Sequence, residues 1–329
     1  MDLKHKLSVL DLSPVIAGQK PMEALKSTIE LAQKIDQLNY LRYWVAEHHG
    51  MRGIATSSPE VVMSHLAQQT KKLRIGSGGI MLPNHAPLKV AENFKTLEAF
   101  HPGRIDLGIG RAPGTDSRTA VALRGSEKHL RADDFPERLI ELMDYLGSEE
   151  RGGVLAMPTI DTYPEIWLLG SSDFSARLSA QLGLPFSFAD HFSHLPARPV
   201  VEMYRSLFKP SAFLKEPRVM LGAHVICADT QEEANDLALS SDHSFFELRQ
   251  RGMSVPLESP ARVKQMGFRR EGVKDISDMG PKKFVGSLNT LKEIFVPYLE
   301  DVGVDEVIIT SFIYDKEARI RSYELLNQL

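Results

Sequence analysis

The sequence predicts an α/β fold, a closed (β/α)8 TIM barrel that occupies residues 1–329 as a single domain. The first observation is a rhythm: short apolar segments typical of strands alternate with amphipathic segments typical of helices, and eight strand-like segments can be counted. That number favours a barrel, because an open doubly wound sheet usually has roughly five or six strands. The length of 329 residues also accommodates a barrel of about 250 residues or more.

The predicted strands are apolar runs bounded by turn residues. The third begins at Leu73 and ends in Gly78-Gly79, where the missing Cβ atoms let another group approach the backbone. The fourth runs from Arg104 to Gly110. The others are predicted at Leu7–Leu12, Leu41–Ala46, Ile166–Leu169, Pro185–Ala189, Val219–Ala228 and Glu306–Phe312.

Helices are predicted where apolar residues recur at spacings of three and four. Pro87–Phe100 shows this spacing, and Pro102-Gly103 ends it. Because this helix joins the third and fourth strands, they are expected to be parallel with a right-handed crossover. The other helices are predicted at Met22–Leu38, Glu60–Thr70, Phe135–Leu146, Ser175–Leu182, Arg198–Phe208, Gln231–Gln250, Asn289–Val302 and Lys316–Leu329.

Two segments do not follow the alternation of strands and helices. Ala112–Asp134, after the fourth strand, is rich in arginine and serine and is predicted to be a polar loop. Gly252–Gly286, between the seventh and eighth strands, carries three prolines and five glycines. Loops of this length in a compact domain are often lids, so residues 252–286 are predicted to be a long irregular excursion that forms a mobile lid.

The composition restricts the class of protein. Hydrophobic residues make up 43% and charged residues 25% of the chain, as in ordinary globular proteins. The net charge is −4 without a long basic run, so nucleic acid is not an expected partner. No apolar run is long enough to span a membrane, and no signal peptide is recognisable at the start. The single cysteine, Cys227, fits a reducing compartment, so a cytoplasmic location is expected.

Candidate site residues follow from the fold, because barrel enzymes place their sites at the C-terminal ends of strands. Gly170–Ser175 offers hydroxyls and free helix amides, which together with Arg111 suit a phosphate dianion. Alternatively, Ser172 or Asp173 simply caps the helix. The residues at the predicted strand ends are Ser13, His48, His49, Gly78, Gly79, Arg111, Ser171, Ser172, Ser175 and His191.

Other patterns are weaker. Gly108–Gly114 has part of the spacing of a dinucleotide fingerprint, but Pro113 stands at the third glycine position and a polar stretch follows. Adjacent residues His48 and His49 point to opposite faces of a strand, so only one can enter the barrel mouth, and no third ligand supports a metal site. His191 is interpreted as a surface histidine or one with satisfied hydrogen bonds.

Four stretches carry a resemblance to a known family: EHH after the second strand, GSGGIMLPNHAPL around the third, AENFKTLEAFHPGRIDLGIGRAPGTD around the fourth and LLGSSDFSARLSAQLGLP around the fifth. They resemble the bacterial luciferase-like flavin monooxygenases, in particular the small single-chain oxidoreductase branch. The likeness covers nearly the whole chain and is densest from Val45 to Asp116. It implies a (β/α)8 barrel that uses reduced FMN and oxygen or, in some branches, the deazaflavin F420.

The resemblance also implies roles for individual residues. Arg111, Ser172 and Ser175 would hold the flavin phosphate, with Ser171 at the place of a glutamate in luciferase. Gly78-Gly79 would carry a non-proline cis peptide against the flavin ring. His48 matches the catalytic histidine of the family. The further cofactor-binding residues expected are Ser13, Met81, Phe188 and His191, of which Met81 and Phe188 would line an apolar mouth.

By this resemblance, the chain is expected to be an FMN-dependent monooxygenase that oxidises a small, largely apolar molecule through a C4a-peroxyflavin. A lid would exclude water, and His48, titrating near neutrality, would act as general base. A separate flavin reductase would supply reduced FMN, and a homodimer is expected. Three alternatives stay open: F420-dependent hydride transfer, a non-catalytic flavin-binding protein, and a phosphate-ligand isomerase or hydrolase on the same barrel.

Overall fold

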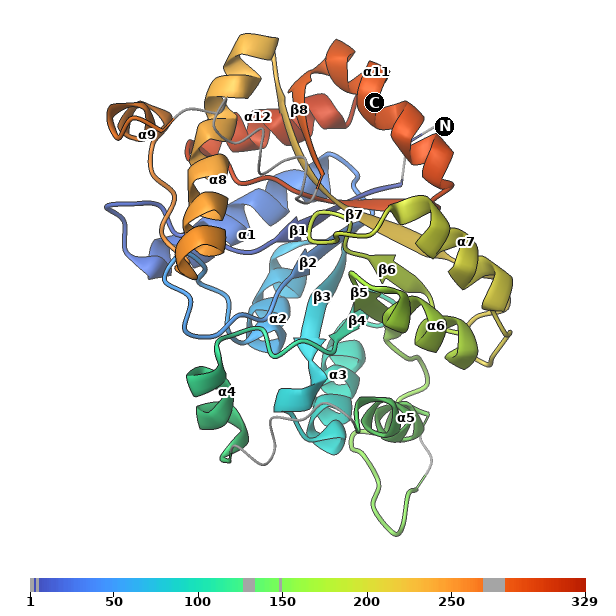
Figure 1. Ribbon diagram of the computed structural model, residues 1–329. Coiled ribbons are helices and arrows are strands. Elements are labelled where there is room, and N and C mark those ends of the chain that lie inside the picture. Colours follow the sequence, from blue (N-terminus) through green and yellow to red (C-terminus); the bar gives the residue numbers. More distant parts are fainter. Residues whose placement is uncertain (1–2, 4–5, 127–133, 148–149, 269–281) are drawn as a thin grey trace.

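The computed structural model describes residues 3, 6–126, 134–147, 150–268 and 282–329, and shows strands enclosed by helices (Figure 1). The strands are β1 (Leu7–Asp11), β2 (Arg42–Val45), β3 (Arg74–Met81), β4 (Ile105–Gly110), β5 (Glu165–Gly170), β6 (Phe186–Phe188), β7 (Val219–Ala228), β8 (Lys283–Ser287) and β9 (Glu306–Thr310). The helices are α1 (Pro21–Gln37), α2 (Pro59–Gln69), the 3-10 turn η1 (Leu82–Asn84), α3 (Pro87–Phe100), α4 (Ser117–Arg124), α5 (Phe135–Leu146), α6 (Asp173–Leu182), α7 (Ala197–Leu207), α8 (Gln231–Arg251), α9 (Pro260–Gln265), α11 (Leu288–Val302) and α12 (Lys316–Leu326).

The eight predicted strands close into a parallel barrel. The order runs from β1 through β2, β3, β4, β5, β6 and β7 to β9, which pairs again with β1. The barrel closes where Phe186 of β6 lies opposite Val219 of β7, and where Met220 lies opposite Glu306 of β9. These pairings confirm the predicted fold class. The strand β8 was not predicted, and it pairs with the C-terminal half of β7.

The segment after β4 contains a helix that the sequence analysis missed. Asp116 caps α4, because its carboxylate accepts hydrogen bonds from the backbone N–H groups of Arg118 and Thr119. The helix ends at Gly125, which has the left-handed conformation that favours glycine. The prediction of a loop from Ala112 to Asp134 is therefore wrong over this helix. Residues 127–133 of that segment lie outside the described residues.

The excursion before β9 is ordered in part, because it contains α9 and β8. Ahead of α9, the buried residue Leu257 donates its backbone N–H to the carbonyl of Val15 at 2.8 Å. The Leu257 carbonyl accepts from the N–H of Ala17 at 2.9 Å. These bonds tether the start of the excursion to the loop after β1. The predicted lid also includes residues 269–281, which lie outside the described residues, so its mobility stays a prediction.

Side-chain alternation divides the core into a barrel interior and an outer layer. Trp44 of β2 and Trp167 of β5 come from strands that are not neighbours, yet their ring centroids lie 5.9 Å apart, so both rings fill the interior. Tyr43 points the other way and joins the larger apolar cluster that includes Leu31 and Ile35 of α1. The outer layer therefore binds the helices to the barrel.

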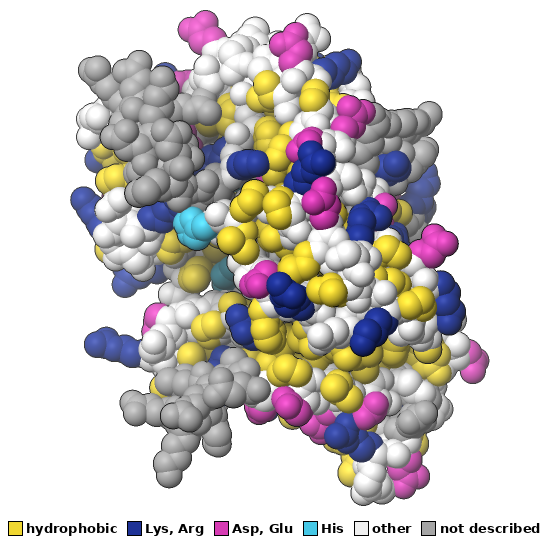
Figure 2. Space-filling view, turned by 45° about the vertical axis from the view of Figure 1, so that its right-hand side comes forward, with side chains coloured by type: hydrophobic (Ala, Val, Ile, Leu, Met, Phe, Trp, Pro, Cys, Tyr) yellow, Lys and Arg dark blue, Asp and Glu magenta, His cyan; other side chains and the backbone are white. Residues whose placement is uncertain are grey.

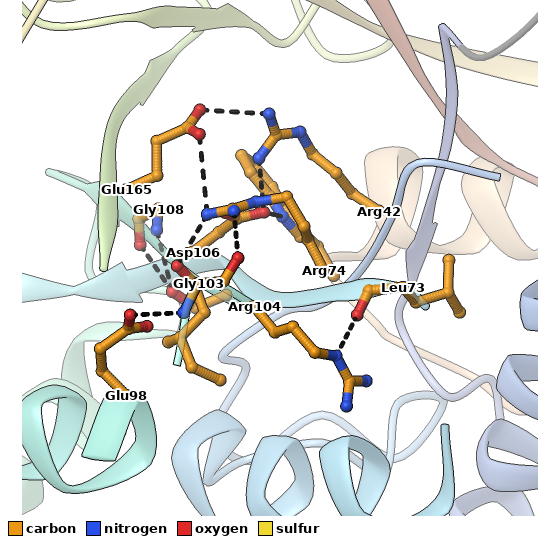
Figure 3. Close-up of polar contacts among 12 residues, drawn as sticks. Arg42, Leu73, Arg74, Glu98, Gly103, Arg104, Asp106, Gly108 and Glu165 are labelled. Carbon is orange, nitrogen blue, oxygen red and sulfur yellow. Dashed lines mark hydrogen bonds and ion pairs between the residues drawn. The ribbon is translucent and has the colours of Figure 1, made fainter. Parts of the chain in front are cut away.

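The N-terminal end of the barrel interior is filled by buried ion pairs (Figure 3). Arg42 places Nη1 at 2.7 Å from Asp106 Oδ2 and Nε at 2.8 Å from Glu306 Oε2. Arg74 approaches the second oxygen of Asp106 at 2.6 Å. Because buried charges are costly unless they are paired, this network holds the starts of β2, β3, β4 and β9 together. We call these four residues, Arg42, Arg74, Asp106 and Glu306, the ionic floor.

The face of the molecule in Figure 2 carries charges of both signs. On the side that Figure 2 presents, lysine and arginine side chains are interspersed with aspartate and glutamate. The whole chain carries 39 basic and 43 acidic residues. Within the described residues, no helix is both long and apolar enough to cross a membrane.

Replacing Arg42 by methionine should destabilise the protein by ~3–5 kcal/mol, because Asp106 and Glu306 would lose their buried partner. Arg198→Met is the matched control, since the Arg198 side chain is 56% exposed where it pairs with Asp301. Its loss should cost far less, because exposed ion pairs contribute little to stability. Urea unfolding of both variants measures the difference. Equal losses in the two variants would contradict a stabilising role for the ionic floor.

Candidate functional site

The C-terminal ends of β3, β4 and β5 lie side by side at the rim of the barrel. Gly78 of β3 pairs with Gly108 of β4, and Leu168 of β5 pairs with Ile109 of β4. In a parallel barrel the residues that follow adjacent strands meet at the same rim. The predicted site residues on these three strand ends are therefore brought together.

The rim between β3 and β4 has no room for side chains. The Gly78-Gly79 peptide is cis, as the resemblance implied. A Cβ on Gly79 would lie 2.8 Å from the carbonyl oxygen of Gly108, and a Cβ on Gly108 would collide with the carbonyl oxygen of Ser77. The half-buried Met81 lies beside this edge, because a Cβ on Gly110 would lie 2.9 Å from its Cε. The missing Cβ atoms therefore let the backbones of β3 and β4 approach each other closely, and Gly78 is half-buried at this edge.

The cationic part of the rim lies next to the start of α6. The guanidinium carbon of Arg111 is 4.1 Å from the ring centroid of Phe174, the second residue of α6. Ser172 is the N-cap residue, but its side chain makes no capping hydrogen bond. Asp173 lies in the first turn and pairs with Arg177 at 3.5 Å. The alternative left open above, in which the Ser172 hydroxyl caps α6, is therefore wrong.

Ser175 completes this group. Its side chain occupies the space that a Cβ on Gly170 would need, so the glycine at the end of β5 admits the hydroxyl. Ser175 is buried, whereas Ser171 is exposed and uses its carbonyl to accept from Ser193 Oγ at 2.9 Å. Arg111, Ser172 and Ser175 thus surround the positive end of a helix, an arrangement suited to an anion.

His48 does not titrate near neutrality. Its backbone N–H donates to the carbonyl of Thr56 at 3.1 Å, and its buried Nδ1 has no hydrogen-bond partner among the described residues. Burial lowers the pKa of His48 to about 4. The expectation of a general base with an ordinary histidine pKa is therefore wrong, because the imidazole is neutral at physiological pH.

Glu47, which directly precedes His48 and His49, is the hydrogen-bonding centre of the rim. Its buried Oε1 accepts from Nε2 of His49 and Nε2 of His85, each at 2.8 Å. Its Oε2 accepts from the backbone N–H of Met81 at 2.8 Å. Burial alone would raise the pKa of Glu47, but the bonds from His85 and the other donors lower it. One carboxylate therefore ties the ends of β2 and β3 to each other.

Asn84 extends this connection to the segment after β4. Its amide donates to Glu47 Oε1 at 3.2 Å and to the carbonyl of Pro113 at 3.0 Å. The pair Asn84-His85, which lies shortly beyond the third predicted strand, was the available sequence signal for these contacts. The described residues contain no group of three or more metal-binding side chains that could hold a metal ion, so a hydrogen-bonding role accounts for this cluster.

Two predicted cofactor-binding residues lie elsewhere. Ser13 has φ +48°, its N–H donates to Asp11, and its hydroxyl lies 2.6 Å from Thr28 Oγ1 of α1. Phe188 belongs to the outer apolar layer, where its ring centroid lies 6.0 Å from that of Phe186. The prediction that the Phe188 side chain lines the mouth is therefore wrong, whereas cofactor binding by Ser13 stays a prediction, with its hydroxyl already engaged by Thr28. Both side chains face the helices.

His191 is buried, and one of its ring nitrogens has no hydrogen-bond partner among the described residues. Its imidazole lies against Gly222 of β7, where a Cβ would come within 2.7 Å of Cε1. The residue is 6% exposed, and its Nδ1 has no partner among the described residues. Burial lowers the pKa of His191 to about 4. A second neutral imidazole therefore lies at the barrel mouth, opposite the glycine edge in strand order.

Neither His48 nor His191 should titrate above pH 5, since burial lowers both pKa values to about 4. His85 should titrate above the ordinary value, because its bond to Glu47 outweighs the effect of burial on its pKa. NMR chemical shifts of the imidazoles, assigned with His48→Gln and His191→Gln variants, measure these values. A midpoint near 6.5 for His48 would contradict the account.

The low pKa values of His48 and His191 also predict how the stability of the protein changes with pH. Between pH 4 and pH 6.5 the unfolded chain binds more protons at His48 and His191 than the folded chain does, with folded pKa values of about 4. Their contribution therefore makes the protein less stable as the pH falls through this window. The double variant with glutamine at both positions should show a flatter dependence of unfolding free energy on pH.

Comparison with known proteins identifies the family. The family model described as luciferase-like monooxygenase matches residues 6–291. A protein named luciferase-like monooxygenase from Escherichia coli strain K12 is 39% identical over 321 residues, which cover 97% of this chain and 95% of that protein. The crystal structure of apo-MsnO8 has a TM-score of 0.91 at 35% identity, and the match covers 98% of this chain and 97% of that one.

A more distant solved structure shows the same fold. The oxygenating constituent of 3,6-diketocamphane monooxygenase from Pseudomonas putida, in complex with FMN, has a TM-score of 0.72 at 19% identity, with 99% of this chain and 97% of that one covered. At this identity the likeness concerns the fold alone. The family model and the two closer proteins extend over almost the entire described barrel. The chain therefore belongs to the luciferase-like monooxygenase family.

Proposed function

We propose that the protein is a monooxygenase that uses reduced FMN and O2 to oxidise a small, largely apolar organic molecule. The observation that carries the proposal is the position of Arg111 on Phe174 at 4.1 Å, beside Ser172 and next to the bare edge of β3 and β4. One end of this rim suits an anion and the other suits a planar ring. FMN joins these two chemical features in one molecule.

The residues present fit FMN. A phosphate dianion favours charge-assisted bonds from an arginine and free amides at a helix start, and α6 and Arg111 supply both. The isoalloxazine needs a surface from which side chains are absent, and the cis peptide at Gly78-Gly79 lies on such a surface. The resemblance between the sequence and other flavin monooxygenases supports the same assignment. Bound reduced FMN would supply two electrons to O2, so that one oxygen atom enters the substrate and the other leaves as water.

The protein's own side chains would bind and orient the reacting groups. His48 and His191 are neutral, so each offers one N–H donor and one acceptor nitrogen to a bound group. With a pKa of about 4, His48 would be a weak base, so we propose that it holds and orients a proton or hydroxyl rather than abstracting a proton. Glu47 keeps the ends of β2 and β3 aligned through its bonds from Met81 and His85.

An apolar substrate suits the opposite side of the mouth. Phe245 of α8 packs against Phe312 and His224 with ring centroids 5.6 Å apart in each pair. The acids nearby are already engaged: Asp242 pairs with Lys283 at 2.7 Å, and Asp190 accepts from the Tyr298 hydroxyl at 2.8 Å. A cationic substrate would find no unpaired carboxylate among these residues.

The partners are part of the proposal. We propose that a separate reductase supplies reduced FMN and that the protein is a cytoplasmic homodimer with the excursion of residues 252–286 acting as a lid. Hydride transfer with F420 and non-catalytic flavin binding are the competing functions. A phosphate-ligand isomerase or hydrolase is disfavoured by the family to which the chain belongs.

Anaerobic titration with reduced FMN and with F420, followed by oxygen and a panel of apolar substrates, separates these functions. The proposal expects tight binding of reduced FMN and a substrate that is oxygenated only when O2 is present. Preferential F420 binding with oxygen-independent reduction or oxidation would establish hydride transfer instead. Binding of FMN without product from any substrate would favour a binding protein.

Arg111→Ala should weaken FMN binding by ~1.5–3 kcal/mol, because a charge-assisted bond to the phosphate is lost. Arg118→Ala is the control, since Arg118 is an exposed arginine on the neighbouring helix α4. Quenching of flavin fluorescence gives the dissociation constants. Unchanged affinity in Arg111→Ala, or an equal loss in both variants, would remove Arg111 from the phosphate site.

A further inference from the structure

Phe174 is the side chain that contacts Arg111, and neither the sequence analysis nor the family resemblance gave it a role. The guanidinium carbon lies 4.1 Å from the centroid of the Phe174 ring, well within the distance at which a cation is attracted to an aromatic face. A guanidinium stacked in this way keeps its N–H groups at its edges, where they can still donate to an anion. The stacking therefore does not block the expected phosphate contact.

The ring is itself held in place. Phe174 is partly buried and packs against the large apolar cluster between the barrel and the helices. It is the second residue of α6, so it lies between the N-cap residue Ser172 and the buried Ser175 on the same turn. A cation that rests on this ring is therefore fixed relative to both hydroxyls.

Arg111 has little else to orient it. The residue is exposed, follows the last residue of β4, and makes no ion pair within the described part of the chain. The nearest acid on α6, Asp173, pairs with Arg177. A free arginine side chain samples many rotamers, and ordering them on binding weakens the complex. Contact with Phe174 removes part of that cost before the ligand arrives.

We propose that Phe174 is a positioning residue that holds Arg111 over the start of α6 and thereby sets the preference of this site for a phosphorylated flavin. The inference rests on the proposed function, because it assumes that FMN binds with its phosphate at Arg111. It goes beyond that function by assigning selectivity between FMN and riboflavin to an apolar side chain.

Riboflavin is the matched probe, because it has the same ring system as FMN and lacks the phosphate. We would measure the dissociation constants of oxidised FMN and riboflavin by flavin fluorescence for the wild type, Phe174→Leu and Phe174→Tyr. Phe213→Leu serves as a control, since Phe213 is an exposed phenylalanine in the loop before β7. Riboflavin affinity also reports whether each variant keeps an intact ring site.

Phe174→Leu should bind FMN roughly two- to fivefold more weakly, as expected for loss of an exposed cation–π contact. Its riboflavin affinity should not change, and Phe174→Tyr and Phe213→Leu should resemble the wild type. An FMN affinity of Phe174→Leu equal to that of the wild type would overturn the role of Phe174 alone. Equal weakening of FMN and riboflavin, or no rescue by tyrosine, would also overturn it. A wild type that does not prefer FMN over riboflavin would instead overturn the proposed phosphate site.

Discussion

The barrel depends on the absence of side chains where β3 meets β4. A Cβ on Gly76 would collide with the indole of Trp44, and one on Gly108 would collide with the carbonyl of Ser77. These glycines let Trp44 fill the interior and donate its indole N–H to Asp106 at 2.8 Å, which joins the tryptophan layer to the ionic floor. The glycines of β3 and β4 therefore serve both the packing of the barrel interior and the close approach of the two strands.

Charge is distributed along the barrel axis in a way that suits the proposed chemistry. The floor carries fully paired arginines and carboxylates, whereas the imidazoles at the mouth, His48 and His191, are neutral. Glu47 is ionised but satisfied by the donors around it, so it orders the rim without presenting a charge to a ligand. Arg111 and the start of α6 then supply the positive character at one point of the rim, where an anionic tail would bind.

The sequence predicted what the topology of a parallel barrel imposes. The adjacent ends of β3, β4 and β5, and with them Arg111, Ser172 and Ser175, follow from strand order alone. The Phe188 side chain was misplaced because the direction of a side chain at a strand end depends on local backbone geometry. The low pKa of His48 and the contacts of Glu47 arise from burial by residues distant in sequence, which no local pattern reports.

The central claim is that one rim holds both ends of FMN, and a crystal structure of the protein with FMN bound tests it most directly. The account predicts the phosphate within hydrogen-bonding distance of Arg111, Ser172 and the first amides of α6. It also predicts the isoalloxazine against the Gly78-Gly79 peptide, at the edge shared by β3 and β4. A flavin bound with its phosphate away from α6, or with its ring away from this glycine edge, would contradict the account.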